Sequence, residues 1–200
     1  MTHAPHKDYS GAKLGMWLFL FTELLLFGGL FVLYAVYLAR YPQEFASGGH
    51  QLNVVLGCIN TLILLTSSLC AAMAVTAIQQ DNRQLTLRLL GGTILCAAGF
   101  MVIKYVEWSA KIHHGIYPGS ARLVEGPPGE SIFFSLYYMS TGIHGLHVLI
   151  GATLLAWIAW KVRNGSITRT DFVILENGAL YWHLVDLIWI FIFPLYYLML

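Results

Sequence analysis

Charged side chains are scarce in this sequence. Only 10% of the 200 residues are charged, whereas 58% are hydrophobic, and the mean hydropathy is +0.67. A soluble domain carries roughly 25% charged residues, so the deficit excludes an ordinary water-facing surface and indicates that most of the chain faces lipid. The formal net charge of +1 supplies no basic surface for nucleic acid.

Cysteine is nearly absent as well. The three cysteines, Cys58, Cys70 and Cys96, all lie inside apolar runs, and none belongs to a C-x-x-C or C-x-x-C-H pattern. This excludes the common zinc, thioredoxin-like and c-type haem motifs. We interpret the three as small apolar residues of helices.

Long apolar runs dominate what remains. Each of five exceeds the ~20 residues that a helix needs to cross a bilayer, and open strands would leave unpaired backbone groups in lipid. We therefore predict an all-α integral membrane bundle over residues 14–200, preceded by a polar tail over residues 1–13. The five transmembrane helices are expected at residues 14–40, 52–78, 85–113, 131–160 and 172–200. Short polar connections rich in proline and glycine join them and force neighbouring helices antiparallel.

Lysine and arginine are distributed unevenly between the two ends of this bundle. Seven lie on the N-terminal side, Lys7, Lys13, Arg83, Arg88, Lys161, Arg163 and Arg169, and three on the other, Arg40, Lys111 and Arg122. The positive-inside rule then predicts a cytoplasmic N-terminus and a periplasmic C-terminus. Small residues such as Gly15 and Gly28-Gly29 are expected to let helix backbones approach closely.

Glu23 is the most informative polar residue. It lies near the midplane of the first span, which holds no other acidic or basic side chain between residues 14 and 38. A carboxylate at that depth is costly unless it faces protein or water, and it is a functional hypothesis by default. Its neighbours one turn away are apolar, so its partner must come from another helix.

Other polar side chains lie within the later spans. Lys104 and Glu107 are spaced for an i,i+3 ion pair. The candidate buried polar residues that accompany Glu23 are Glu107, His144, His147, Glu176, His183 and Asp186. His144 and His147 share one face of the fourth span, and Glu176, His183 and Asp186 form a polar stripe on the fifth. A contact between a histidine and a carboxylate of these last two spans is expected.

Three chemical interpretations of these groups stay open. His144, His147, His183 and Glu23 offer ligands of the type that bind iron or copper, although histidines inside bundles more often bond to a carboxylate or carbonyl. Acidic and histidine groups near the midplane also suit a proton path. The third interpretation, internal pairing that fixes helix register or meets a partner subunit, is favoured for most of the cluster. No catalytic residue and no metal ligand is assigned.

Four stretches of the sequence resemble subunit III of haem–copper terminal oxidases, the cytochrome c oxidase subunit III family. They lie at residues 13–23, 59–68, 140–147 and 181–189, and they contain the motifs His-Gly-Leu-His and Tyr-Trp-His-x-x-Asp. The two motifs are specific together, in that order and on the last two spans. Many members of the family have seven membrane helices, whereas five are predicted here.

The resemblance implies a subunit of a bacterial inner-membrane respiratory complex that reduces oxygen and pumps protons. Such a subunit holds no haem or copper. It contacts subunit I, which carries out the redox step, and it joins subunit II, small subunits and phospholipid. It supports stability and sustained proton uptake. Glu23 matches the family's carbodiimide-reactive carboxylate, and the six other candidates match interior polar positions. A quinol-oxidase or nitric-oxide-reductase homologue and a free-standing proton-coupled transporter are the alternatives.

Overall fold

The computed structural model describes residues 9–198, and seven helices lie in that range. They are α1 (Tyr9–Arg40), α2 (Pro42–His50), α3 (Val54–Gln79), α4 (Arg83–His113), α5 (Ala121–Val124), α6 (Pro128–Arg163) and α7 (Val173–Tyr197). Five of them, α1, α3, α4, α6 and α7, are long and apolar enough to cross a membrane. The predicted all-α fold with five spans is confirmed.

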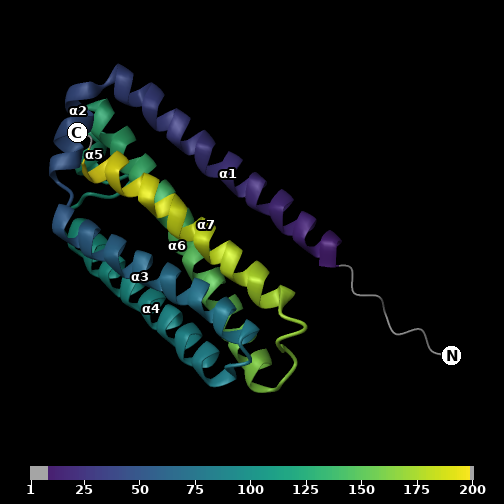
Figure 1. The fold of residues 1–200 in the computed structure, drawn as a ribbon. Coiled ribbons are helices and arrows are strands. Elements are labelled where there is room, and N and C mark those ends of the chain that lie inside the picture. Colours follow the sequence, from purple (N-terminus) through teal and green to yellow (C-terminus); the bar gives the residue numbers. More distant parts are fainter. Residues whose placement is uncertain (1–8, 199–200) are drawn as a thin grey trace.

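Four of the spans form a closed ring. Helix α3 packs on α4, α4 on α6, α6 on α7, and α7 back on α3, as Figure 1 shows. Two of these helices start at asparagine caps, because Asn53 Oδ1 accepts the Leu56 N–H and Asn82 Oδ1 accepts the Leu85 N–H. The side chains that point into the ring make up the interior of the protein.

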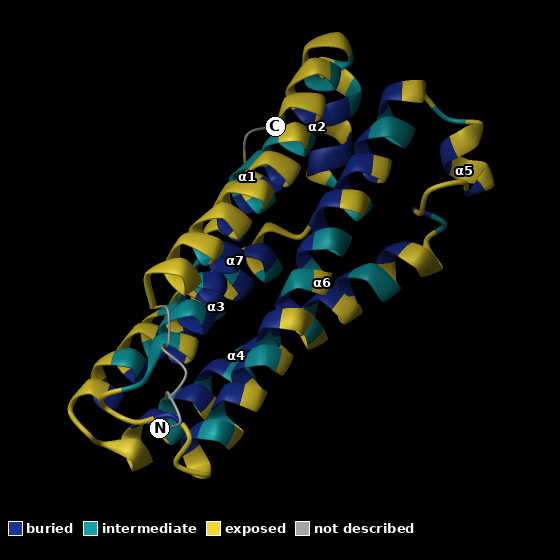
Figure 2. Ribbon diagram, turned by 90° about the vertical axis from the view of Figure 1, so that its right-hand side faces the viewer, coloured by how far each residue is buried: buried dark blue, intermediate teal, exposed yellow. Residues whose placement is uncertain are grey.

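Helix α1 lies outside this ring and packs against α2, α6 and α7. Only 11% of its most apolar window is buried inside the chain, whereas 61% of the corresponding window of α7 is buried. Figure 2 shows the contrast as a mostly exposed α1 beside a mostly buried α7. The long apolar surface of α1 therefore faces lipid or a neighbouring protein.

Two short helices occupy segments that the sequence predicts as loops. Helix α2 begins at Pro42, whose fixed φ suits the first helical position. Phe45 is fully buried and its ring lies 5.3 Å from that of Phe133 on α6. Packing against α6 thus keeps α2 helical despite Gly48 and Gly49. Of the predicted polar tail, Tyr9–Lys13 is helical, and residues 1–8 lie outside the described residues, as do residues 199–200 at the predicted end of the last span.

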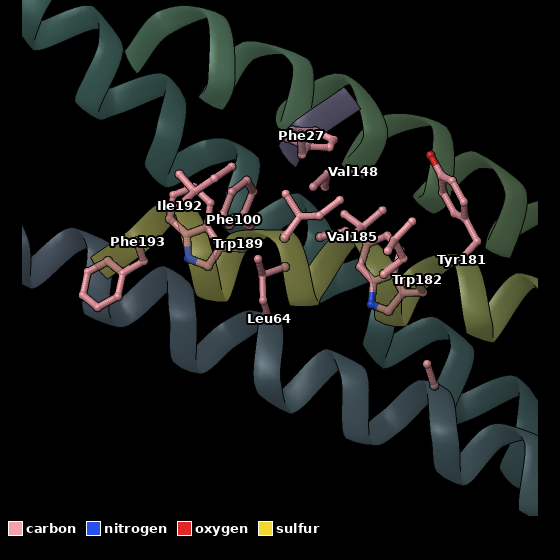
Figure 3. Close-up of a cluster of buried hydrophobic side chains, with 14 of the residues drawn as sticks. Phe27, Leu64, Phe100, Val148, Tyr181, Trp182, Val185, Trp189, Ile192 and Phe193 are labelled. Carbon is pink, nitrogen blue, oxygen red and sulfur yellow. The ribbon is translucent and has the colours of Figure 1, made fainter. Parts of the chain in front are cut away.

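Large aromatic side chains of α7 fill the ring interior. Trp182 and Trp189 are fully buried, and Figure 3 shows them with Leu64 of α3 and Phe100 of α4. Each indole N–H donates to α3, Trp182 to Ser67 and Trp189 to Thr61, both at 3.0 Å. Apolar packing and two buried hydrogen bonds therefore fix α7 against α3.

Close helix approach occurs at glycines other than those expected. A methyl group at Gly151 of α6 would lie 2.8 Å from a ring carbon of Trp182, and one at Gly178 of α7 would lie 2.3 Å from Ile158. At Gly15, Gly28 and Gly29 such a group would meet no atom within 4 Å. The expectation that the α1 glycines bring backbones of this chain together is therefore wrong, because Gly15 and Gly29 are exposed and Gly28 borders an open groove beside α7.

Candidate functional site

Glu23 of α1 pairs with His147 of α6. The distance from Glu23 Oε2 to His147 Nε2 is 2.8 Å, and the two side chains are 15% and 12% exposed. Phe27 lies edge-on to the imidazole at 5.5 Å, and Tyr181 stacks near it at 6.5 Å. The expectation that Glu23 finds its partner on another helix is met by this contact.

The hydrogen-bond partners of His147 limit where the hydrogen of this contact can lie. The other ring nitrogen of His147, Nδ1, lies 2.8 Å from the carbonyl oxygen of Ile143. A carbonyl only accepts, so Nδ1 carries a hydrogen, and a neutral ring then has none on Nε2. The contact with Glu23 therefore holds its proton either on the carboxyl group or on the imidazole. The contact is therefore either a neutral hydrogen bond or an ion pair.

A second polar centre lies inside the ring toward the ends of α4 and α7. Lys104 Nζ and Glu107 Oε2 are 2.8 Å apart, as the i,i+3 spacing predicts, and both side chains are less than 10% exposed. The Tyr197 hydroxyl donates to Glu107 at 2.8 Å. The ammonium group also lies 5.0–5.5 Å from the ring centroids of Tyr137, Trp189 and Tyr197, at which distance ring faces attract a cation.

Sequence reasoning did not identify this aromatic cage. Tyr137, Trp189 and Tyr197 carry no charge and look like ordinary core or interface residues. The signal that points to them is Lys104 itself, because a buried ammonium needs partners beyond one carboxylate and aromatic ring faces attract cations. The neighbouring hydroxyls of Tyr137 and Tyr197, 3.1 Å apart, extend the network.

The polar stripe of the last span contacts two different neighbours. Glu176 pairs with Lys13 of α1 at 3.0 Å, and both side chains are substantially exposed. His183 Nδ1 lies 2.7 Å from the Ser68 hydroxyl on α3. The stripe therefore links α7 to α1 at one end and to α3 further along, and His183 makes no contact with a carboxylate of α6.

Asp186 and His144 are the two candidates without hydrogen-bond partners. Both are buried, at 3% and 0% exposure, and neither the Asp186 oxygens nor the His144 nitrogens make a hydrogen bond of ordinary geometry to a described residue, although the Ser68 side chain lies near the Asp186 carboxyl. The His144 ring packs instead against Phe100 and Trp189, with centroids 5.5 and 5.2 Å away. The contact expected between a histidine and Asp186 is not formed, because His144 turns toward aromatic rings and His183 toward Ser68.

The histidines and carboxylates are spread over separate places. Between residues 9 and 198, no group of three or more His, Cys, Asp or Glu side chains is close enough to hold a metal ion. His144 and His147 are three residues apart on α6. The His147 side chain nevertheless faces α1, whereas the His144 side chain faces the ring interior. The three cysteines are unpaired thiols on α3 and α4.

These features define a polytopic helical membrane protein in which three charged side chains of the spans, Glu23, Lys104 and Glu107, are paired within the chain. Residues 2–199 match the model of the family described as cytochrome c oxidase subunit III. The chain belongs to this family.

Named relatives come from several kinds of oxidase. The chain is 33% identical to the cytochrome bo(3) ubiquinol oxidase subunit 3 of Pseudomonas putida, over 97% of this chain and 88% of that one. It is 30% identical to the cytochrome c oxidase subunit 3 of Synechocystis, over 98% of this chain and 79% of that one. It is 32% identical to the heme-copper oxidase subunit I+III of Aeropyrum pernix, over 92% of this chain but only 22% of that one.

Proposed function

We propose that this chain is the accessory subunit III of a bacterial inner-membrane haem–copper oxidase, and that it stabilises the oxygen-reducing subunit and sustains its proton uptake. Haem and copper would be held by the partner subunits, with subunit I in direct contact. Subunit II, small subunits and phospholipid would complete its surroundings. The two alternatives that do not reduce oxygen, a nitric-oxide-reductase homologue and a free-standing transporter, are not favoured by the family match.

The Glu23–His147 pair is the observation that carries the proposal. It lies at the boundary between the exposed helix α1 and the ring, where a neighbouring subunit or lipid would cover α1. A pair of ionisable groups at such a boundary suits proton exchange with a partner.

The other charged pairs support the bracing part of the role. The buried pair Lys104–Glu107 fixes the cage between α4, α6 and α7, whereas the exposed pair Lys13–Glu176 adds only a weak link from α1 to α7. Removing one partner of a buried pair leaves an uncompensated charge, which costs about 3–5 kcal/mol. A rigid bundle held in this way would support a larger assembly that must survive many catalytic cycles.

The test compares the purified complex with and without this chain. We expect the chain to co-purify with haem-bearing subunits in mild detergent, and the complex that lacks it to keep its haem spectrum but lose activity faster during continuous turnover. Purification of the chain without any haem-bearing partner would refute the proposal. Equal activity lifetimes for the two complexes would refute the supporting role.

A quinol oxidase is a specific second candidate, because relatives named as ubiquinol oxidase subunits stand beside those named as cytochrome c oxidase subunits. The two candidates differ only in the electron donor of the partner subunits. Oxygen consumption by the purified complex, measured with reduced cytochrome c and then with a water-soluble quinol, distinguishes them.

A further inference from the structure

The phenol of Tyr197 lies in a directed chain of hydrogen bonds at the end of α7. Its hydroxyl donates to the two oxygens of Glu107, at 2.8 and 3.0 Å, and accepts from the Lys104 ammonium at 2.9 Å. The Tyr137 hydroxyl lies 3.1 Å away. A phenol has a single hydrogen, and Tyr197 gives its hydrogen to Glu107, so Tyr137 is the donor in this second contact. The chain therefore runs from Tyr137 through Tyr197 to the carboxylate.

The carboxylate acceptor distinguishes Tyr197 from the other buried tyrosines that the structure describes. Tyr34 and Tyr181 donate to backbone carbonyl oxygens, and the Tyr196 hydroxyl lies 3.0 Å from that of Ser140. A carbonyl or a hydroxyl is a poor proton acceptor, whereas a carboxylate is a good one. Loss of an electron makes a phenol strongly acidic, so a phenol is oxidised more readily when a neighbouring base takes its proton in the same step. Tyr197 has such a base.

The proton that Glu107 receives has a way out of the bundle. Glu107 lines an open pocket of about 440 Å³ at the end of α4, together with Lys111 and His114. Water that enters this pocket can take the proton from the carboxyl group. The Lys104 and Lys111 ammonium groups already face Glu107, and a further positive charge among them would be costly. Release of the proton to water avoids that cost, because the oxidised Tyr197 is then neutral.

A row of aromatic rings joins Tyr197 to the surface of the bundle. The ring centroids of Tyr197 and Tyr137 are 6.2 Å apart. The Tyr138 ring lies 5.4 Å beyond that of Tyr137, and the Trp108 ring 5.1 Å beyond that of Tyr138. Tyr138 and Trp108 are half-buried, and Trp108 lines an open apolar groove between α4 and α6. Tyrosine and tryptophan are the aromatic side chains that are oxidised most readily, so this row, Tyr137–Tyr138–Trp108, can carry electrons in short steps.

We propose that Tyr197 is a redox-active tyrosine that gives one electron to an oxygen-derived oxidant through the aromatic row. The phenolic O–H bond breaks, the electron leaves along the row, and the proton passes to Glu107 and on to water, so a neutral phenoxyl radical remains. The oxidant is either a high-valent haem iron, which is reduced by one electron, or a peroxyl radical in the lipid, which takes the electron and a proton from water and becomes a hydroperoxide. Only the haem source rests on the function proposed above.

The experiment detects tyrosyl radicals in the purified complex by electron paramagnetic resonance after rapid freezing. One arm adds hydrogen peroxide, which oxidises haem iron to its high-valent state. The other arm adds a lipid-soluble azo initiator in aerated buffer, which yields peroxyl radicals without haem. We expect a tyrosyl component that narrows when the cells are grown on ring-deuterated tyrosine and that is lost in Tyr197→Phe. The matched control is Tyr34→Phe, which removes a buried phenol that donates to a carbonyl, and it should keep the component.

The proton acceptor is tested by Glu107→Gln. The amide oxygen can still accept the hydrogen bond of Tyr197 but is a poor base, so we expect the tyrosyl component to be lost although the phenol is present. A component that survives in Glu107→Gln overturns the role of Glu107. If this variant does not assemble, Tyr197→Phe decides, because that change keeps the Lys104–Glu107 pair.

The two arms separate the two sources of the oxidant. A component that depends on Tyr197 and forms with peroxide identifies haem as a source, and one that forms with the initiator identifies the lipid radical. Equal signals of wild type and Tyr197→Phe in both arms overturn the proposal. A purified complex without haem would contradict the proposed function instead, and the initiator arm would still decide whether Tyr197 is redox-active.

Discussion

Glu23 and His147 act as one unit at the scale of single residues. In Glu23→Gln the new amide still donates to His147 Nε2, so the contact survives while the acidic proton is lost. We expect the complex to assemble and to lose at most about 1.5–3 kcal/mol of stability, which is the contribution of a hydrogen bond to a charged group. We also expect the complex to lose activity faster during prolonged turnover. Activity followed over many cycles is the measurement.

The matched control for this change is Glu176→Gln. It also removes a carboxylate that pairs with another helix, but at an exposed site, where an ion pair contributes about 0–1 kcal/mol. The control is expected to behave as wild type. An unchanged active lifetime in Glu23→Gln would assign the pair a passive role.

Two buried carboxyl groups in different surroundings provide a second comparison. Glu107→Gln leaves the Lys104 ammonium in its cage without a counter-ion, so we expect a loss of about 3–5 kcal/mol. Asp186→Asn makes the same chemical change at similar burial, but Asp186 has no ion-pair partner among the described residues and only the Ser68 side chain near its carboxyl, so we expect a much smaller loss of stability. Thermal melting of the purified complexes tests both.

The opposite order of melting temperatures would contradict this assignment. The same comparison tests whether Asp186 stabilises a buried histidine. The sequence suggested that Asp186 satisfies a buried histidine, in which case any change at Asp186 would destabilise the bundle. The observed geometry places Ser68, rather than Asp186, beside His183.

Sequence alone identified which residues need partners, but not all of the partners. The Lys104–Glu107 pair follows from helical spacing within one element, and it is present. The partner of Glu23 lies 124 residues away, and no local pattern specifies which of several intramembrane histidines would meet it. The aromatic cage was missed for the same reason, since its members come from α6 and α7 while the cation comes from α4.

Helix existence was predictable at the scale of elements, because long apolar runs admit little else in a bilayer. The short helix α2 was not. Pro42, Gly48 and Gly49 indicate a loop by local propensity, and burial of Phe45 against α6 overrides them. Which glycines bring helices together also depends on the face that each presents, which a pattern of small residues does not reveal.

Helix packing gives a prediction at this scale. Gly151→Ala places a methyl group 2.8 Å from the Trp182 ring, and such overpacking costs typically about 1–3 kcal/mol. Gly28→Ala adds the same group where no atom lies within 4 Å, so it should leave stability unchanged. Melting temperatures of the two variant complexes are compared, and equal values would show that the α6–α7 contact yields without cost.

The arrangement of the whole molecule predicts its topology. Five spans place the two termini on opposite sides, and the excess of lysine and arginine at the end that holds Lys13, Arg83 and Lys161 favours the cytoplasm for that end. In intact cells, Glu125→Cys should react with a membrane-impermeant maleimide and Ser166→Cys should not. Both positions are exposed. Labelling of Ser166→Cys alone would reverse the orientation, and labelling of both would contradict the span count.

The position of α1 outside the ring also constrains biosynthesis. Helix α1 leaves the ribosome before the other four spans, yet apart from the adjoining α2 the helices that it packs on are α6 and α7, the last two of the described helices to be made. Glu23 precedes His147 by 124 residues, so at about 5–20 residues per second its carboxyl waits roughly 6–25 seconds before its imidazole emerges. During that interval the Glu23 carboxyl must either be covered by an insertase or be neutral while it faces lipid. Insertion of α1 is therefore the step at which nascent chains are most exposed to quality control.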